Sequence, residues 1–233
     1  MTDNITVKRN ELKYYINYTD YKVLYEILDN LLLLTQDENV IRTKGLIRSL
    51  YFDTIYDKAF YEKEAGVLNR KKYRLRIYDL DTEKVKFEIK NKFNNQILKE
   101  TAFISREDTI EVQNENYEVL LKYNNPVLNK AYCDFKKDPH RPVAVIEYIR
   151  EAFMFPFNDV RITFDKKLKA TSKSLDIFAK DHLMKPLFKK GILVMEVKYN
   201  TFLPLRVKKL IQVPRLQRSA ISKYCIGRMG EYI

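Results

Sequence analysis

The chain contains very few of the residues from which metal clusters, disulfide frameworks and nucleotide-binding loops are built. It has only two cysteines, Cys133 and Cys225, and two histidines in 233 residues. The cysteines are far apart and neither has a second cysteine nearby, so neither a zinc site nor a disulfide framework is indicated. The sequence also has no GxxxxGK[ST] and no GxGxxG stretch, which excludes nucleotide binding by those two loops.

Long apolar runs are missing as well. The first residues, MTDNITVKRNELKYYI, are polar and lack the apolar segment of a signal peptide. No run approaches the roughly 20 apolar residues that a membrane-spanning helix needs. We therefore expect a soluble, cytoplasmic protein whose cysteines stay reduced.

The composition is that of a folded globular protein with a large excess of positive charge. Hydrophobic residues make up 45% and charged residues 32%, with only 5 glycines and 7 prolines, so disorder is not indicated. This length is ordinary for one β-rich domain, and we expect a single domain over residues 1–233. The net charge of +12 predicts an anionic partner, such as nucleic acid, an acidic membrane or a polyphosphorylated molecule.

Alternation of apolar and polar residues predicts a sheet. In KYRLRIYDLDTEKVKFEIKNK (72–92) the apolar residues recur at every second position on both sides of a short break, which indicates a β-hairpin. Similar segments recur along the chain. The predicted strands are 7–16, 45–54, 71–78, 85–92, 97–105, 143–152, 160–168 and 192–200.

Helical spacing is found between these strands. A first helix is expected over 19–36 with Thr19 as its cap, and a short helix within 56–66. Another is expected near 113–123, followed by a loop to His140. Two more are expected late in the chain, one from Pro204 and one within 219–229. The fold class is therefore α+β.

The polar faces of the predicted strands carry charged residues throughout, and nearly every strand contributes a cation. The residues are Glu11, Lys13, Arg74, Arg76, Lys86, Glu88, Lys90, Lys99 or Glu100, Tyr148, Arg150, Arg161, Thr163, Asp165, Glu196 and Lys198.

Two interpretations of these faces are open. They can be the solvated side of an antiparallel sheet, which is the usual case for one hairpin. They can also line the inside of a barrel, where clustered cations repel one another unless a polyanion neutralises them. Arginine on several strands favours the second interpretation, because its planar fork binds phosphate oxygens in pairs. Glu11, Glu88 and Glu196 would then be oxygen ligands for Mg²⁺ or Mn²⁺.

Several short motifs, taken in order, resemble one known family. They are RNELKY (9–14), SLYFDT (49–54), KYRLRIY (72–78), KFEIKNK (86–92), LKE (98–100), EYIREAF (147–153), VRITFD (160–165), MEVKYN (195–200) and SKY (222–224). They resemble the polyphosphate polymerase (VTC) domain of the triphosphate tunnel metalloenzyme superfamily, in its stand-alone bacterial form. Within SLYFDT, Asp53 and Thr54 are expected to close a turn.

The resemblance implies a closed antiparallel β-barrel of about eight strands with flanking helices and a basic lumen. It implies transfer of the γ-phosphate of ATP to a growing inorganic polyphosphate chain, with Mn²⁺ or Mg²⁺ as cofactor. The implied catalytic residues are Lys13, Arg74, Arg76, Lys90, Arg150 and Arg161. The implied phosphate-binding residues are Lys99, Tyr148, Lys198 and Lys223, and the implied metal ligands are Glu196, Glu88 and Glu11.

Other functions remain open from the sequence. A triphosphatase would use the same lumen with water as the acceptor, and a non-catalytic polyphosphate-binding protein would use it without turnover. A nucleic-acid binder is disfavoured, because the basic residues alternate into strands and do not gather with aromatic residues on an exposed face. A membrane partner that receives the product is not defined by the sequence.

Overall fold

The computed structural model describes residues 10–30, 35–36, 45–94, 96–155, 157–181, 183–212 and 216–230. Within them, one antiparallel sheet contains eight strands in the continuous order β1-β10-β8-β7-β3-β4-β5-β6. These strands are β1 (Asn10–Asn17), β3 (Leu46–Thr54), β4 (Arg70–Ile77), β5 (Lys84–Phe93), β6 (Gln96–Ser105), β7 (His140–Phe155), β8 (Val160–Thr171) and β10 (Ile192–Tyr199). Two further short strands, β2 (Thr35–Gln36) and β9 (Lys185–Pro186), pair with β7 and β8.

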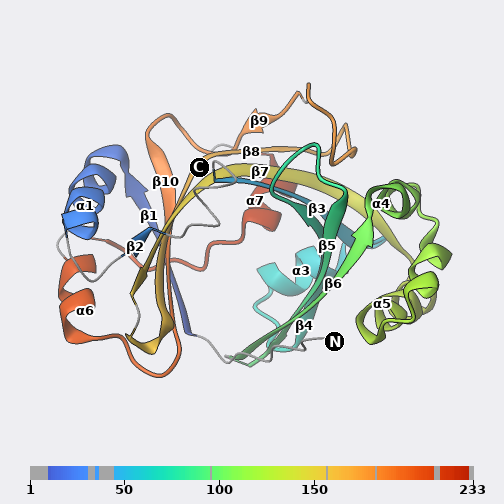
Figure 1. Ribbon diagram of the computed structural model, residues 1–233, viewed down its shortest axis with the longest axis horizontal. Helices are drawn as coiled ribbons and strands as arrows, with labels where there is room; N and C mark the ends of the chain where they lie inside the picture. Colours follow the sequence, from blue (N-terminus) through green and yellow to red (C-terminus); the bar gives the residue numbers. More distant parts are fainter. Residues whose placement is uncertain are drawn as a thin grey trace.

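The sheet bends into an arch (Figure 1). β1 and β10 form one side, β7 and β8 pass over the top, and β4, β5 and β6 form the other side. β1 and β6 are the two ends of the path, and no strand pairing joins them within the described residues. The prediction of a closed barrel is therefore wrong, whereas the antiparallel sheet with flanking helices is confirmed. Alternation defines which side chains share a face, but closure depends on the tilt and stagger of the whole sheet.

The alternating pattern places apolar side chains on the outer, convex face of the arch. In β5, Val85, Phe87 and Ile89 are completely buried in an apolar cluster. Lys86, Glu88 and Lys90 are the intervening residues, so they lie on the concave face. Burial of such rows provides the main driving force for folding, at roughly 25 cal/mol per Å² of apolar surface.

Helices cover the convex face at both sides of the arch. α4 (Arg106–Gln113), the 3₁₀ helix η1 (Tyr117–Tyr123) and α5 (Pro126–Lys137) pack beside β5 and β6. α1 (Tyr18–Asn30) and α6 (Leu205–Ile211) lie together next to β1 and β10. The charged face of the sheet is therefore left on the inside of the arch.

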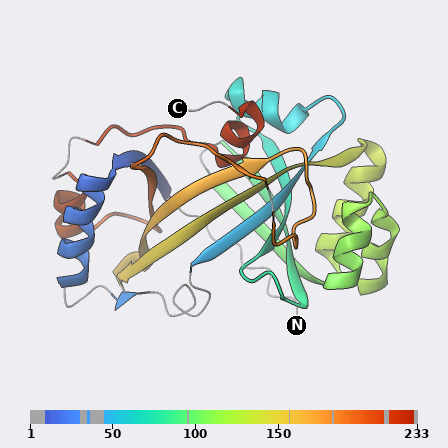
Figure 2. The ribbon, with the colours of Figure 1, turned by 90° about the horizontal axis from the view of Figure 1, so that it is seen from above.

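Two short helices, α3 (Lys58–Glu64) and α7 (Lys223–Met229), lie together at one end of the arch (Figure 2). α7 packs very closely on the sheet. A Cβ atom added at Gly227 would lie 3.0 Å from the Ile146 Cδ1 atom and 3.2 Å from the Ala170 Cβ atom. Glycine at this position therefore lets the helix backbone approach the strands.

The predicted helices are confirmed in part. The helices within 56–66, after Pro204 and within 219–229 are present as α3, α6 and α7. The first helix begins at Tyr18, where the Asn17 side chain accepts a hydrogen bond of 2.8 Å from the Asp20 amide, so Thr19 is not the cap. Thr35 and Gln36, predicted as helix, form β2, and residues 31–34 lie outside the described residues.

The region 106–140 was predicted incorrectly. Residues 113–123 are split between the end of α4 and η1, and the predicted loop contains α5. The Asn125 side chain caps α5 by accepting a 2.9 Å hydrogen bond from the Val127 amide, and Pro126 occupies its first turn. Leu128, Ala131 and Phe135 are buried on one face at helical spacing. The sequence signal was present, but a loop was expected over the whole stretch from residue 123 to His140.

Each predicted strand is present among the described residues, with boundaries that differ from the prediction by a few residues. Residues 7–9 of the first predicted strand lie outside the described residues. β7 is the longest, because it extends to His140 at one end and to Phe155 at the other. No helix in the described part of the chain is long and apolar enough to span a membrane.

Candidate functional site

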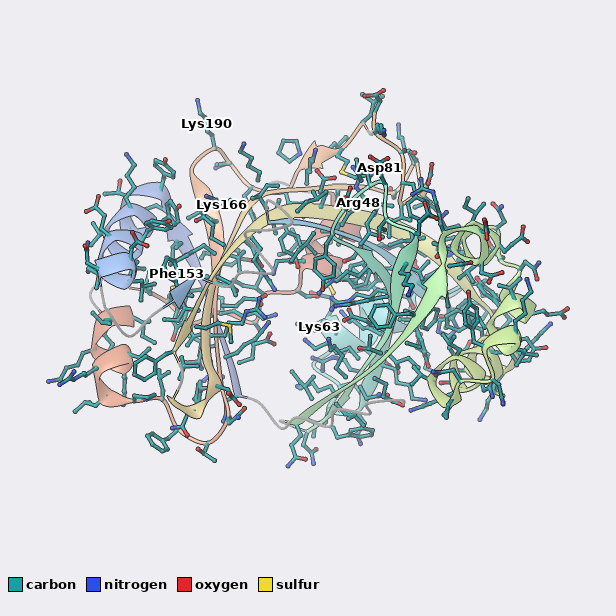
Figure 3. The ribbon with its side chains drawn as sticks, viewed as in Figure 1. Arg48, Lys63, Asp81, Phe153, Lys166 and Lys190 are labelled. Carbon is teal, nitrogen blue, oxygen red and sulfur yellow. The ribbon has the colours of Figure 1, made fainter. Side chains whose placement is uncertain are left out.

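A cavity of about 680 Å³ lies beneath the arch and is lined mainly by charged side chains. It receives residues from seven strands, from α3 and from residues 218–224, the segment that leads into α7. In Figure 3 the side chain of Lys63, on α3, lies beneath the arch. The lining includes ten of the predicted site residues, which are Glu11, Lys13, Arg74, Arg76, Lys90, Tyr148, Arg150, Glu196, Lys198 and Lys223.

Glu196 lies at the centre of a dense group of charges on one side of the cavity. Its carboxylate is 2.6 Å from the Lys223 Nζ atom, 3.1 Å from Lys198 Nζ and 3.4 Å from an Arg150 nitrogen. Burial raises the pKa of Glu196, but Lys223 and the other cations outweigh burial and hold the pKa well below its usual range. Glu196 is therefore ionised at any ordinary pH.

Asp165 belongs to the same group, although the sequence analysis placed it on this face without assigning it a role. Arg150 donates to it in the two-pronged geometry, with Nε at 2.6 Å and Nη2 at 2.7 Å from the two carboxylate oxygens. The Lys223 Nζ atom lies 2.6 Å from Asp165 as well as from Glu196. Asp165 is completely buried. The signal that could have identified it is its place after Arg161 and Thr163 in the same alternating strand.

Glu11 completes this side of the cavity. Its carboxylate lies 3.6 Å from each of three amines, those of Lys13, Lys90 and Lys198. Burial raises the pKa of Glu11, but Lys90 and Lys13 lower it to about 2. We call this group of charged residues the mixed wall. It consists of Glu11, Lys13, Arg150, Asp165, Glu196, Lys198 and Lys223.

The opposite side of the cavity contains cations that the sequence analysis missed. Lys72 lies on β4 two residues before Arg74, so the alternation of KYRLRIY already places it on the same face. Its amine is 3.2 Å from the Ser222 hydroxyl and 4.5 Å from the centre of the Tyr224 ring. Burial lowers the pKa of Lys72 to about 8. We call this second group the basic rim; it consists of Lys63, Arg70, Lys72 and Lys92.

Arg74 and Arg76 connect the two groups, and a buried carboxylate holds them in place. Glu88 lies 2.7 Å from Arg74, 3.8 Å from Arg76 and 2.9 Å from Lys99. Burial raises the pKa of Glu88, but Arg74 and Arg76 hold it well below its usual range. Tyr51 accepts a 3.0 Å hydrogen bond from Arg74.

The remaining predicted residues are arranged around this cavity. Tyr148 places its ring 5.3 Å from the Arg150 guanidinium and 5.0 Å from the Lys223 amine, in cation–π contacts. Lys99 and Arg161 are not among the lining residues. Lys99 lies opposite Lys90 on β6, and Arg161 lies opposite Lys198 on β8.

Two carboxylates could hold a divalent metal ion. Glu11 and Glu196 both line the cavity, and Lys13 and Lys198 each contact both of them. Mg²⁺ is commonly bound by one or two carboxylates, with substrate phosphates and water as the other ligands, so this pair fits such an ion. No group of three histidine, cysteine or acidic side chains suited to a metal occurs in the described residues. Glu88, the third predicted metal ligand, is not among the residues that line the cavity, and its carboxylate contacts Arg74, Arg76 and Lys99.

Asp53 has a structural role, as expected. Its carboxylate accepts hydrogen bonds of 2.8 Å from the Thr54 and Ala59 amides and of 3.0 Å from the Phe60 amide. The Tyr224 hydroxyl donates to the same carboxylate. Asp53 therefore joins the start of α3 to α7, and so fixes the two helices that carry Lys63 and Lys223.

Fold and site together define a protein with an arched antiparallel sheet whose concave face carries a cavity lined by clustered cations. The chain belongs to the VTC domain family, whose model matches residues 8–230. This confirms the resemblance seen in the sequence.

The chain is also similar to solved structures. A Hippeastrum protein, HpAC1, considered an adenylyl cyclase but with a dominant triphosphatase activity, has a TM-score of 0.58 at 16% identity, over 97% of both chains. The PH1819 protein from Pyrococcus horikoshii OT3 has a TM-score of 0.48 at 13% identity, over 93% of this chain and 96% of that one. No curated protein sequence matches the chain.

Proposed function

We propose that this protein is a metal-dependent polyphosphate polymerase that transfers the γ-phosphate of ATP to the end of an inorganic polyphosphate chain. The observation that carries the proposal is a single cavity lined by cations from β1, β4, β5, β7, β10 and α7, with two ionised carboxylates among them. Membership of the VTC domain family supports it.

The reaction needs positioning and charge neutralisation more than covalent chemistry from the protein. A terminal oxygen of the polyphosphate chain attacks the γ-phosphorus of ATP, and the bond from that phosphorus to the β,γ-bridging oxygen breaks. ADP leaves, and the chain is one phosphate longer. The nucleophile is already ionised, so no general base is required.

The arginines would stabilise the charge that builds up on the transferred phosphoryl group. Arg74, Arg76 and Arg150 reach the cavity from β4 and β7, on two sides of it. Each is held by a buried carboxylate, Glu88 or Asp165, which fixes its orientation before the substrate arrives. Lys13, Lys90, Lys198 and Lys223 would neutralise the remaining phosphate oxygens. Arg161 and Lys99, outside the lining, would act at its edges.

Glu11 and Glu196 would hold Mn²⁺ or Mg²⁺, which would neutralise part of the charge of the phosphates. Lys13 and Lys198 contact both carboxylates, so their amines would lie beside the metal and would contact phosphate oxygens there.

The test is to incubate the purified protein with ATP and Mn²⁺, with and without a short polyphosphate primer, and to resolve products on a polyphosphate-staining gel. We expect long chains from the wild type, and a loss of at least about a hundredfold in rate for Glu196→Gln. Glu118→Gln, at an exposed ion pair with Lys136, is the matched control and should behave as the wild type. Absence of chains under all these conditions would contradict the proposal.

A triphosphatase is the second candidate, and one observation favours it. α3 and α7 lie together at one end of the arch, and residues 218–224 line the cavity there. A site that receives its substrate from one end suits hydrolysis, in which water is the acceptor. Release of free phosphate from ATP or from inorganic triphosphate, without chains on the gel, would establish this activity.

A further inference from the structure

Three of the four cations of the basic rim lie directly opposite another cation. Arg70 on β4 is opposite Lys92 on β5, and Lys72 is opposite Lys90, which lies outside the rim and contacts Glu11. Like charges at directly opposed positions of an antiparallel pair destabilise a sheet. The Arg70–Lys92 pair in particular therefore works against the stability of the fold.

In the described part of the chain, no carboxylate forms an ion pair with the rim residues Lys63, Arg70, Lys72 and Lys92, whereas the neighbouring Lys90 contacts Glu11. Arg70 donates to the Val67 carbonyl, and Lys72 contacts the Ser222 hydroxyl. Lys71, on the same strand but on the opposite face, has a carboxylate partner, with its amine 3.1 Å from Asp134. Lys71 and the rim cations therefore differ in whether they have a carboxylate partner, and this difference depends on which face of β4 they occupy. The lack of partners is thus a property of the cavity and not of the whole segment.

The electrostatic environment of the rim is strained in the absence of an anion. Burial lowers the pKa of Lys92, and nearby Arg70 and Lys63 lower it further. Burial likewise lowers the pKa of Lys72 to about 8. A bound anion would remove both penalties, since it favours the charged form of each amine.

The rim continues the row of arginines along one face of β4. Arg70, Lys72, Arg74 and Arg76 occupy alternate positions, and successive members are about 7 Å apart along the strand. A triphosphate held at Arg74, Arg76 and the mixed wall does not need the two cations at the start of the strand. A longer phosphate chain would pass over them.

We propose that the basic rim is a separate subsite that binds the phosphates of a polyphosphate chain lying beyond the reacting triphosphate. This rests on the proposed function, because it assumes that a phosphate chain enters the cavity. The subsite makes affinity depend on chain length and keeps the growing chain on the protein between successive transfers.

Single-stranded nucleic acid is a poorer fit to the rim. Proteins that bind it stack bases on accessible aromatic rings. The rings next to the rim, Tyr51 and Tyr224, are buried and stacked on each other, with 5.3 Å between their centres. The rim therefore offers charge without a stacking surface.

The test compares the double variant Arg70→Gln/Lys92→Gln with the wild type, by calorimetric titration with inorganic triphosphate and with long-chain polyphosphate, both without metal. We expect the variant to lose about tenfold or more in affinity for the long chain and less than about twofold for triphosphate. A long chain offers many overlapping binding positions, which raise the apparent affinity of both proteins by the same factor. The ratio of the variant's affinity to that of the wild type therefore reports the contribution of the rim alone. Lys71→Gln is the matched control and should bind both ligands as the wild type does.

Thermal unfolding of the unliganded proteins gives a second readout. Removing both cations of the opposed Arg70–Lys92 pair relieves their repulsion, so the double variant should have a Tm equal to or above that of the wild type. A purely structural role for Arg70 and Lys92 predicts a lower Tm.

Several outcomes would overturn the subsite. They are an equal loss for both ligands, no loss for the long chain, the same loss in Lys71→Gln, or equally tight, rim-dependent binding of a single-stranded oligonucleotide. The polymerase gel on the same preparations separates the two proposals. Long chains on the gel with length-independent binding would reject only the subsite, whereas length-dependent binding without chains would reject only the polymerase.

Discussion

Both sides of the cavity bring cations close together, but only one of them places carboxylates among these cations. On the mixed wall, Glu11, Asp165 and Glu196 lie between the cations and neutralise them in the absence of any ligand. On the basic rim, cations face cations, and carboxylate partners are missing among the described residues. The comparison separates a side whose cations have carboxylate partners from a side whose cations, among the described residues, do not.

The largest expected effect comes from breaking the mixed wall. Asp165→Asn removes a completely buried carboxylate that pairs with the Arg150 guanidinium and is one of the two carboxylates in contact with Lys223. Leaving buried charges uncompensated typically costs about 3–5 kcal/mol, and we expect the free energy of unfolding to fall by that amount in a urea titration.

A matched comparison tests the reason for that loss. Inorganic triphosphate should raise the Tm of Asp165→Asn more than that of the wild type, because the anion replaces the missing negative charge. Glu118→Gln, on the surface, should change the free energy of unfolding by less than about 0.5 kcal/mol. An Asp165→Asn protein as stable as the wild type would show that the wall is not held by its ion pairs.

The next effect concerns the carboxylate between the two sides. Glu88→Gln should lower the free energy of unfolding by about 2–3 kcal/mol, less than Asp165→Asn, because one of its partners, Lys99, is half exposed. Titration calorimetry with Mn²⁺ and inorganic triphosphate should give the wild-type metal affinity. A metal affinity that collapses in Glu88→Gln, but not in Glu11→Gln, would instead return Glu88 to the metal site predicted from the sequence.

A smaller effect is expected from moving α7 away from the sheet. In Gly227→Ala the added methyl group must displace Ile146 or Ala170, which costs about 1–3 kcal/mol, partly offset by a gain in helix propensity of up to about 1 kcal/mol. Lys223, at the start of α7, should shift with it. Calorimetry should show weaker triphosphate binding, while the ratio of long-chain to triphosphate affinity stays unchanged. A change in that ratio would mean that α7 acts on both sides of the cavity.

The smallest effect is a pH dependence at the basic rim. The pKa of Lys72 is lowered to about 8 by burial, so its charge is present below that pH and is lost as the pH rises through it. Affinity for long-chain polyphosphate should therefore fall by about twofold to fivefold across this range. Lys72→Arg keeps its charge and should show a smaller decrease. Identical pH profiles for the two proteins would show that Lys72 does not contact the chain.

The sequence identified most of the fold, because alternation and helical spacing are local properties. KYRLRIY and KFEIKNK predicted both strands of the hairpin and the face that carries Arg74, Arg76 and Lys90. Helix α5 was missed because a loop was expected up to His140, although Asn125 and Pro126 form a helix start. The hydrogen-bonded closure of the barrel was predicted wrongly, since closure is a property of the whole sheet.

Within the site, the sequence placed residues on the correct face but did not define their partners. Glu88 and Glu196 have the same alternating context in sequence, yet Glu196 lines the cavity while Glu88 is enclosed by Arg74, Arg76 and Lys99. Which carboxylate meets which cation depends on strand register and on α7, whose Lys223 comes from far along the chain. The distances between these charged groups are set only when the chain folds, so the sequence alone does not give them.

The open margin between β1 and β6 affects how the two sides of the arch are held together. Within the described residues no backbone pairing joins β1 to β6, but the Lys90 amine on β5 lies 3.6 Å from the Glu11 carboxylate on β1. An ion pair of this kind weakens when salt screens it, whereas a ladder of backbone hydrogen bonds does not. The contact between the two sides of the arch therefore depends on ionic strength, as the seam of a hydrogen-bonded barrel would not.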